Sequence, residues 1–136
     1  MNNIFQIYHD KTLIPPFVNE QIIKLNPNYE YRFIDFVEGV EIIKENIKDE
    51  KLKKQILHCM KKYPRLCHKS DLLRYCLLYI YGGVYIDVDL QPLVSFKEMI
   101  PENVSFFSSM SFVLKLFDTL DNLFNVSNSL SDKNSR

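Results

Sequence analysis

Two aspartates, Asp87 and Asp89, are separated by one residue and come just after the β-branched and aromatic run Val84–Ile86. The run is typical of a buried strand, and its period of two places Tyr85, Asp87 and Asp89 on one side. Carboxylates at this end of a strand lie where open α/β sheets bind ligands. Because neighbouring like charges repel, the pair favours a divalent cation such as Mg²⁺ or Mn²⁺, which could also neutralise a leaving diphosphate.

An apolar helix is expected just before this strand, from Ser70 to the break at Gly82. Ser70 is a favourable N-cap, which would place Asp71 in the first turn at the positive end of the helix dipole. Asp71 and Arg74 are three residues apart and therefore share one helix face. The other side chains are apolar nearly all round, which predicts a buried helix. The two charges are then either a structural ion pair or a pair that faces a polar ligand.

Three known patterns contain two aspartates at this spacing. An EF-hand loop is rejected because Pro92 occupies its sixth position, where a glycine is needed, and because a strand precedes the loop. A D-x-D-x-T phosphatase is disfavoured because Gln91 stands where that motif has its threonine. The D-x-D of nucleotide-sugar glycosyltransferases remains, although that motif alone is a weak signal.

Strand and helix patterns alternate along the rest of the chain. Strands are expected over residues 3–9, 29–36, 84–86 and 104–108, and helices over residues 17–25, 37–62 with a break near Asp49, 70–81, 95–100 and 112–124. The polar segment 125–136 is expected to be disordered. This order predicts an α/β fold with a mainly parallel sheet.

Composition narrows the class of protein. The chain has 136 residues, which suits one domain, and its 17 basic and 17 acidic residues give no net charge. A neutral chain argues against a nucleic-acid partner. The three cysteines have no C-x-x-C spacing and favour a reducing compartment. No signal peptide or transmembrane segment is recognisable, so a cytoplasmic location is expected.

The run S-D-L-L-R-Y-x-x-L-Y-x-Y-G-G-V-Y-I-D-V-D over residues 70–89 resembles the glycosyltransferases with a DXD-containing sugar-binding region. This family includes fungal mannosyltransferases and capsular sugar transferases, and is similar in this region to the clostridial glucosylating toxins. The opening I-F-Q-I-Y resembles the family's I-H-Q-x-W, with Phe5 in place of the histidine and Tyr8 in place of the tryptophan. N-P-N-Y-E-Y-R-F-I-D over residues 26–35 resembles its N-P-x-Y segment.

The resemblance implies a GT-A, Rossmann-like fold and a metal-dependent, retaining transfer of a sugar from a UDP- or GDP-sugar. It implies that Asp89 binds Mn²⁺ or Mg²⁺ directly, while Asp87 reaches the ribose and, through water, the metal. Asp71 and Arg74 would hold the donor sugar and diphosphate, and Tyr85 would line the donor pocket.

The first strand would meet the nucleotide base at Gln6 and Tyr8. The resemblance assigns no catalytic residue and leaves the glycan, lipid or protein acceptor open. Residues 1–110 would form the donor-binding part of a GT-A domain that is incomplete at the C-terminus, followed by the helix and the tail. A second hypothesis is a truncated, inactive remnant that at most binds nucleotide sugar or a partner.

Overall fold

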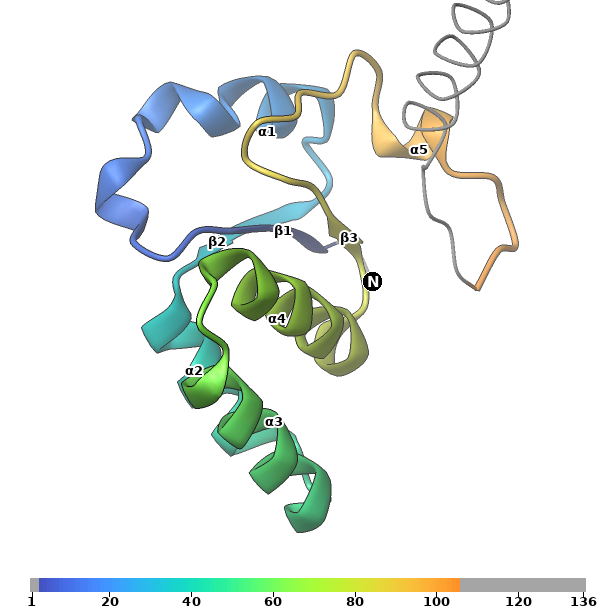
Figure 1. Cartoon of the computed structure of the whole chain (residues 1–136). Helices are drawn as coiled ribbons and strands as arrows, with labels where there is room; N and C mark the ends of the chain where they lie inside the picture. The colour runs from blue at the N-terminus through green and yellow to red at the C-terminus, as the bar shows by residue number, and fades with distance from the viewer. Residues whose placement is uncertain (1–2, 106–136) are drawn as a thin grey trace, which may run out of the picture. The chain divides into compact units, whose positions relative to one another are not determined.

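The computed structural model describes residues 3–105, and the chain divides into two compact units, Met1–Met99 and Ile100–Arg136. All the regular elements described below belong to the first unit (Figure 1). In chain order they are β1 (Asn3–Ile7), η1 (Lys11–Leu13), η2 (Pro16–Asn19), α1 (Glu20–Leu25), β2 (Glu30–Ile34), α2 (Phe36–Asn46), α3 (Glu50–Lys62), α4 (Leu66–Tyr81), β3 (Val84–Tyr85) and α5 (Phe96–Met99). No described helix is long and apolar enough to cross a membrane.

The three strands form one parallel sheet in the order β2-β1-β3, which confirms the α/β prediction. Phe5 of the central strand pairs with Arg32 on one side and with Tyr85 on the other. The hydrogen bond from the Ile86 amide to the Phe5 carbonyl, 3.0 Å long, continues the contact beyond β3. Pairing with β1 therefore places the aspartates of the D-x-D next to the end of the first strand.

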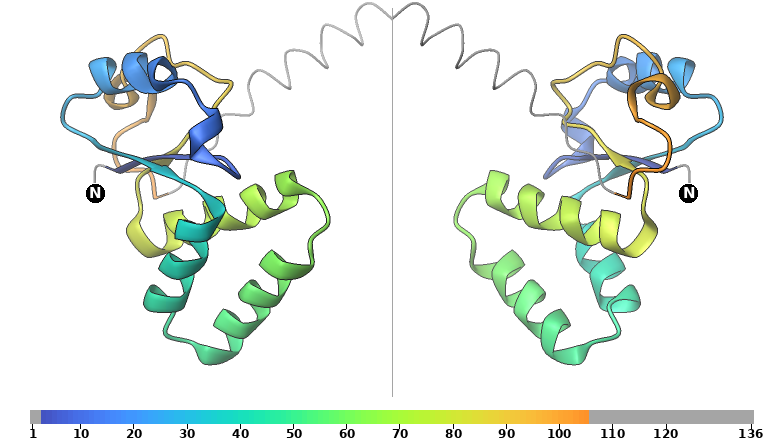
Figure 2. Two further views of the ribbon diagram at one scale, coloured as in Figure 1. Left: turned by 90° about the vertical axis from the view of Figure 1, so that its left-hand side faces the viewer. Right: turned by 90° about the vertical axis from the view of Figure 1, so that its right-hand side faces the viewer.

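Helices cover both faces of the sheet (Figures 1 and 2). On one face, Phe5 and Ile7 belong to a buried cluster with the apolar sides of α2, α3 and α4, among them Ile43 and Leu77. Because side chains alternate along a strand, Ile4 and Gln6 point to the opposite face, on the side of α1. Both are fully buried. A polar side chain, Gln6, is thus buried on this second face of the sheet.

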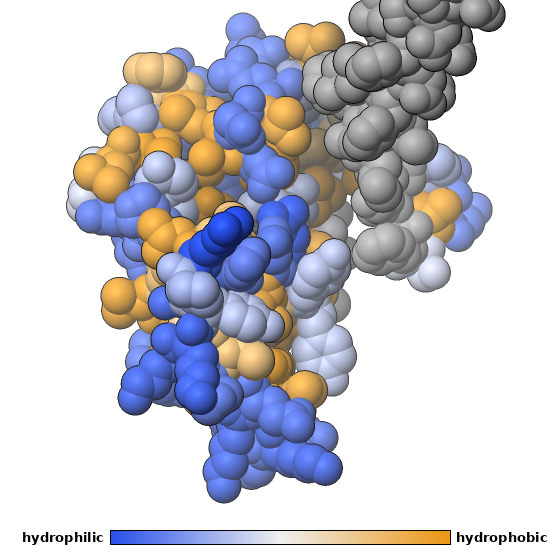
Figure 3. Space-filling model, in the orientation of Figure 1, coloured by the Kyte–Doolittle hydropathy of each residue, from blue (hydrophilic) through white to orange (hydrophobic). Residues whose placement is uncertain are grey.

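Capping residues define the two helices that follow β2. The Asp35 carboxylate accepts a hydrogen bond from the Glu38 amide and begins α2, and Asp49 caps α3 in the same way. The break predicted near Asp49 is confirmed. Hydrophilic side chains gather over α3 (Figure 3). Its lysines Lys51, Lys54, Lys61 and Lys62 are exposed, as expected for a solvated face, whereas Lys53 is half-buried and pairs with Glu50 at 2.8 Å.

Helix α4 differs from its prediction at its start. It begins at Leu66, so Ser70 lies inside the helix, and Arg65 occupies the N-cap position without a side-chain hydrogen bond. The N-cap assigned to Ser70 and the first-turn position of Asp71 are therefore wrong. Extending an existing helix adds one backbone hydrogen bond for each residue fixed, which outweighs the capping preference of a single serine.

The surroundings of α4 also correct the prediction of a helix buried all round. Leu73, Cys76 and Leu77 are buried, but the outward face carries Tyr75 and Tyr79, the latter 76% exposed. A helix that covers one face of a sheet buries only the side turned toward that sheet. The two tyrosines can face solvent on the other side because their hydroxyl groups are polar.

Several predictions concern residues near or beyond the described range. Val104 and Ser105, in the strand predicted over 104–108, are not in a strand, and the rest of that segment lies outside the described residues. The helix predicted over 112–124 and the tail over 125–136 also lie outside them.

Candidate functional site

Arg74 is the centre of a polar cluster at the end of β3. It projects from α4, and its Nη2 donates to Oδ1 of Asp71, one helical turn earlier. The same nitrogen lies 3.8 Å from Oδ1 of Asp87. Its guanidinium carbon lies 4.6 Å from the centre of the Tyr85 ring, which is cation–π distance. One arginine thus connects the helix motif with the strand motif.

Tyr85 and Asp87 lie on the same side, as the period of two predicted. The Tyr85 hydroxyl donates to Oδ1 of Asp87 over 2.6 Å. Burial raises the pKa of the Tyr85 phenol, as do its hydrogen bond to the Asp87 carboxylate and that group's negative charge, while the charge of Arg74 opposes them. The phenol therefore remains a hydrogen-bond donor at neutral pH.

The D-x-D forms a turn where the sequence suggested continued alternation. The strand ends at Tyr85, and the Leu90 amide donates to the Asp87 carbonyl over 3.1 Å, with Val88 and Asp89 in the centre of the turn. Asp89 is exposed, and the side chain of Asp87 is 44% exposed. The turn presents both carboxylates to solvent, where a ligand can reach them.

Gln6 contacts this turn from the first strand. Its Nε2 donates to the Asp87 carbonyl over 3.2 Å, and its Oε1 accepts a 2.7 Å hydrogen bond from the Tyr31 hydroxyl. The side chain is 0% exposed. Both ends of the amide are therefore bonded within the protein, and Gln6 shows no surface that a nucleotide base could touch.

Tyr8 follows β1 and belongs to a short row of aromatic rings. Its ring centre lies 4.5 Å from that of His9, which lies 6.5 Å from that of Phe36 at the start of α2. Tyr8 is half-buried, and its amide donates to the Ile34 carbonyl over 3.2 Å. The ring is thus held at the carboxyl ends of two parallel strands, where α/β proteins bind ligands.

Comparison with known proteins decides the family. The family described as "glycosyltransferase sugar-binding region containing DXD motif" matches residues 17–106. This chain belongs to that glycosyltransferase family. No curated protein and no solved structure matched the chain. The matched region contains the Arg74 cluster and the D-x-D turn, so a glycosyltransferase-related role follows from the family.

A divalent cation is the cofactor that membership of a DXD glycosyltransferase family suggests. The turn can supply only part of the ligands that such an ion needs. Among residues 3–105, no group of three or more His, Cys, Asp or Glu side chains is arranged to hold a metal ion. Asp87 and Asp89 supply hard oxygen ligands, as Mg²⁺ and Mn²⁺ prefer. Two carboxylates suit an ion that takes its other ligands from water and substrate phosphates, so the donor would complete the site.

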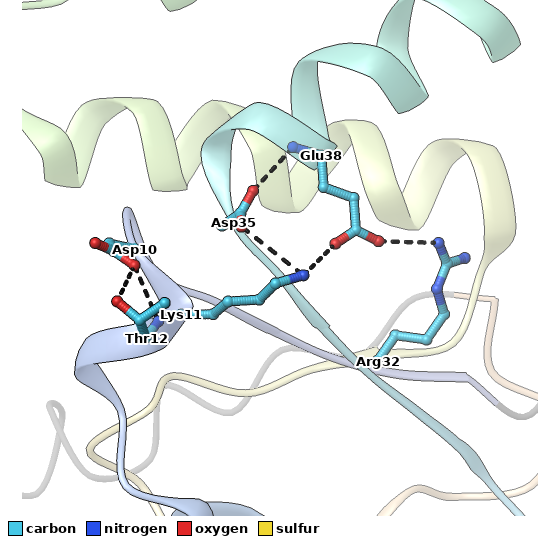
Figure 4. Close-up of polar contacts among 6 residues, drawn as sticks. All are labelled: Asp10, Lys11, Thr12, Arg32, Asp35 and Glu38. Carbon is cyan, nitrogen blue, oxygen red and sulfur yellow. Dashed lines mark hydrogen bonds and ion pairs between the residues drawn. The ribbon is translucent and has the colours of Figure 1, made fainter.

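A second polar network joins the segment after β1 to β2 and to the start of α2 (Figure 4). Lys11 donates to Glu38 over 3.1 Å and lies 3.8 Å from Asp35, while Arg32 lies 3.9 Å from Glu38. Arg32 also lies over the Tyr81 ring at 4.7 Å. The network joins its cations to protein carboxylates and fixes the entry to α2, so we assign no ligand to it.

Sequence reasoning missed two residues that hold the segment containing the D-x-D. Tyr31 holds Gln6, and Asn26, which is buried, accepts a 2.8 Å hydrogen bond from the Phe96 amide at the start of α5. Asn26 belongs to the N-P-N-Y segment, which supported the family resemblance without indicating a role for this side chain. The alternation of the second strand placed Tyr31 on a face, but no local pattern showed which polar group it would meet.

Proposed function

We propose that this chain transfers a sugar from a nucleotide-diphosphate donor in a metal-dependent, retaining reaction on a GT-A fold. The observation that carries this proposal is the contact of Arg74 with Asp71, Tyr85 and Asp87. These residues come from two motifs that the family match joins, and they form one partly open cluster. The sheet order β2-β1-β3 with helices on both faces supports the fold assignment.

The family resemblance suggests the role of each side chain, and the chemistry of that side chain supports it. Asp89, which is exposed in the turn, would bind Mn²⁺ or Mg²⁺, and Asp87 would contact the ribose and reach the metal through water. Arg74 binds the diphosphate, because a guanidinium pairs well with phosphate oxygens. Asp71 accepts hydrogen bonds from sugar hydroxyls, and Tyr85 forms a wall of the donor pocket.

The metal would lower the energy of the leaving nucleoside diphosphate by neutralising its charge. The protein's part is to hold the donor in place. The Nε atom of Arg74 is buried and has no hydrogen-bond partner among the described residues, so the terminal nitrogens of this partly exposed side chain are the ones that would contact the diphosphate. The half-buried ring of Tyr8 offers a stacking surface for the base.

Donor turnover tests this function. The purified chain is incubated with a panel of UDP- and GDP-hexoses and Mn²⁺, and release of the nucleoside diphosphate is measured. We expect release that needs the metal and is lost in Asp89→Ala. The matched control is Asp49→Asn, which removes a distant carboxylate and keeps an N-cap residue.

Two outcomes would contradict a transferase. A folded wild-type chain that neither binds nor turns over any donor refutes the proposal. Metal-dependent binding without release, with or without added sugar acceptors, instead supports the alternative of an inactive nucleotide-sugar-binding module.

A further inference from the structure

A chain of two hydrogen bonds, centred on the buried side chain of Gln6, connects the second strand to the D-x-D turn through the first strand. The Tyr31 hydroxyl donates to Oε1 of Gln6 over 2.7 Å, and Nε2 of Gln6 donates to the Asp87 carbonyl over 3.2 Å. Gln6 and Asp87 are 81 residues apart in sequence. The chain therefore ties the turn to the centre of the sheet.

The Asp87 carbonyl accepts two hydrogen bonds. One comes from Gln6, and the other comes from the Leu90 amide at 3.1 Å, the bond that closes the turn. A carbonyl oxygen has two lone pairs, so both are used. The Gln6 bond thus fixes the orientation of the peptide group that begins the turn.

The two partners of the Gln6 amide require the same orientation. The Asp87 carbonyl can only accept, so it takes the NH₂ group, and the Tyr31 hydroxyl holds the other end of the amide by donating to its oxygen. A reversed amide would place its oxygen against that carbonyl, and two acceptors cannot bond each other. Burial raises the pKa of Tyr31 to about 12, so the hydroxyl keeps its proton at neutral pH.

We propose that Tyr31 is a positioning residue that acts through Gln6 on the D-x-D turn, and that neither side chain touches the donor. Only one part of this inference rests on the proposed function. That part is the consequence for ligand binding, namely that the fixed turn holds its carboxylates in the geometry that a metal–donor complex needs. Its structural part, the fixed turn, can be measured without any ligand.

Exchange of the Leu90 amide with solvent, followed by NMR, tests the structural part. Tyr31→Phe and Gln6→Met each remove one link at nearly constant volume, and we expect the amide to exchange about tenfold faster in both. Tyr29→Phe is the matched control, because it removes a hydroxyl from a ring that packs against Phe96 rather than against Gln6.

A double variant separates a relay from two independent effects. If Tyr31 acts through Gln6, exchange in Tyr31→Phe with Gln6→Met is no faster than in Gln6→Met alone. The proposal would be overturned if the two substitutions together increased the Leu90 exchange rate by the product of their separate effects. It would also be overturned if the Leu90 amide exchanged equally fast in Tyr31→Phe and in Tyr29→Phe. If Gln6→Met does not fold, the comparison of the two tyrosine variants decides the question.

Titration calorimetry with Mn²⁺ and UDP- and GDP-hexoses tests the consequence of the fixed turn for donor binding. We expect Tyr31→Phe and Gln6→Met to weaken metal-dependent donor binding by roughly tenfold, the low end of the effect of residues that orient metal ligands. Unchanged affinity despite faster Leu90 exchange would overturn the positioning role. A wild-type chain that binds no donor refutes the proposed function instead, and the exchange data still decide the relay.

Discussion

The guanidinium of Arg74 lies over the ring of Tyr85, with 4.6 Å between Cζ and the ring centre. Arg74 belongs to a helix and Tyr85 to the strand that follows it, and two glycines turn the chain between them. In this position the guanidinium has one of its nitrogens, Nη2, on the side of Asp87. The donor site we propose is therefore built around a single stacked arginine.

Replacement of Arg74 should affect binding much more than stability. We expect Arg74→Ala to weaken metal-dependent donor binding by about 10–100-fold, the value of one or two hydrogen bonds to a charged group. Its ion pairs are partly exposed, so the free energy of unfolding should fall by about 1 kcal/mol or less. Calorimetry and denaturant unfolding measure the two effects, with Arg65→Ala at an exposed position as the control. Equal donor affinity in the two variants would remove Arg74 from the site.

Two half-buried tyrosine side chains, Tyr31 and Tyr85, predict a loss of stability at alkaline pH. Burial raises the pKa of both Tyr31 and Tyr85 in the folded chain above the ordinary value of 10.0. The unfolded chain then releases these protons first, so this contribution is complete below about pH 10 and is lost as the pH rises further. Unfolding measured from pH 8 to 12 should have a flatter pH dependence in Tyr31→Phe and in Tyr85→Phe. If the unfolding free energy of both variants had the same pH dependence as that of the wild type, the prediction would be contradicted.

Gly83 should not tolerate a side chain. Its φ is +104°, and a Cβ atom there would lie 2.4 Å from the carbonyl oxygen of Asn3. The backbone strain and the displacement of β1 from β3 should together cost at least about 2 kcal/mol of unfolding free energy in Gly83→Ala. Urea denaturation measures this value. A variant within about 0.5 kcal/mol of wild type, the usual range for surface changes, would show that this contact is not tight.

The N-cap at Asp35 gives a prediction for the stability of α2. Asp35→Ala removes the 2.9 Å hydrogen bond to the Glu38 amide and should cost about 1 kcal/mol, whereas Asp35→Asn keeps a capping oxygen. Thermal unfolding should therefore rank wild type and Asp35→Asn above Asp35→Ala. If Asp35→Asn were as unstable as Asp35→Ala, its ion pair with Lys11, and not the cap, would be the important contact.

Local contacts of the site could be predicted from the sequence. Asp71 and Arg74 are one helical turn apart, and Tyr85 and Asp87 are two residues apart along an extended segment, so helix and strand periods placed each pair on one side. The break between two helices at Asp49 could also be predicted, because capping is a local contact between its side chain and the nearest amides of the helix.

Contacts between distant segments could not be predicted in this way. The pairing of Gln6 with the Asp87 carbonyl depends on which strands become neighbours, and no local pattern fixes that. The family resemblance placed Gln6 in the donor site, but the buried amide faces main chain and Tyr31 instead. The N-cap at Ser70 was wrong because capping preference is weak compared with continuation of a helix.

Titration calorimetry tests the central claim, that the Arg74 cluster and the D-x-D turn form one metal-dependent donor site. UDP- and GDP-hexoses are titrated into the wild-type chain and into Asp89→Ala, with Mn²⁺ and with the metal chelated, and Asp49→Asn serves as the control. We predict binding by wild type and control that needs Mn²⁺ and disappears in Asp89→Ala. Binding that is equal in Asp89→Ala, or that persists without metal, would contradict this account.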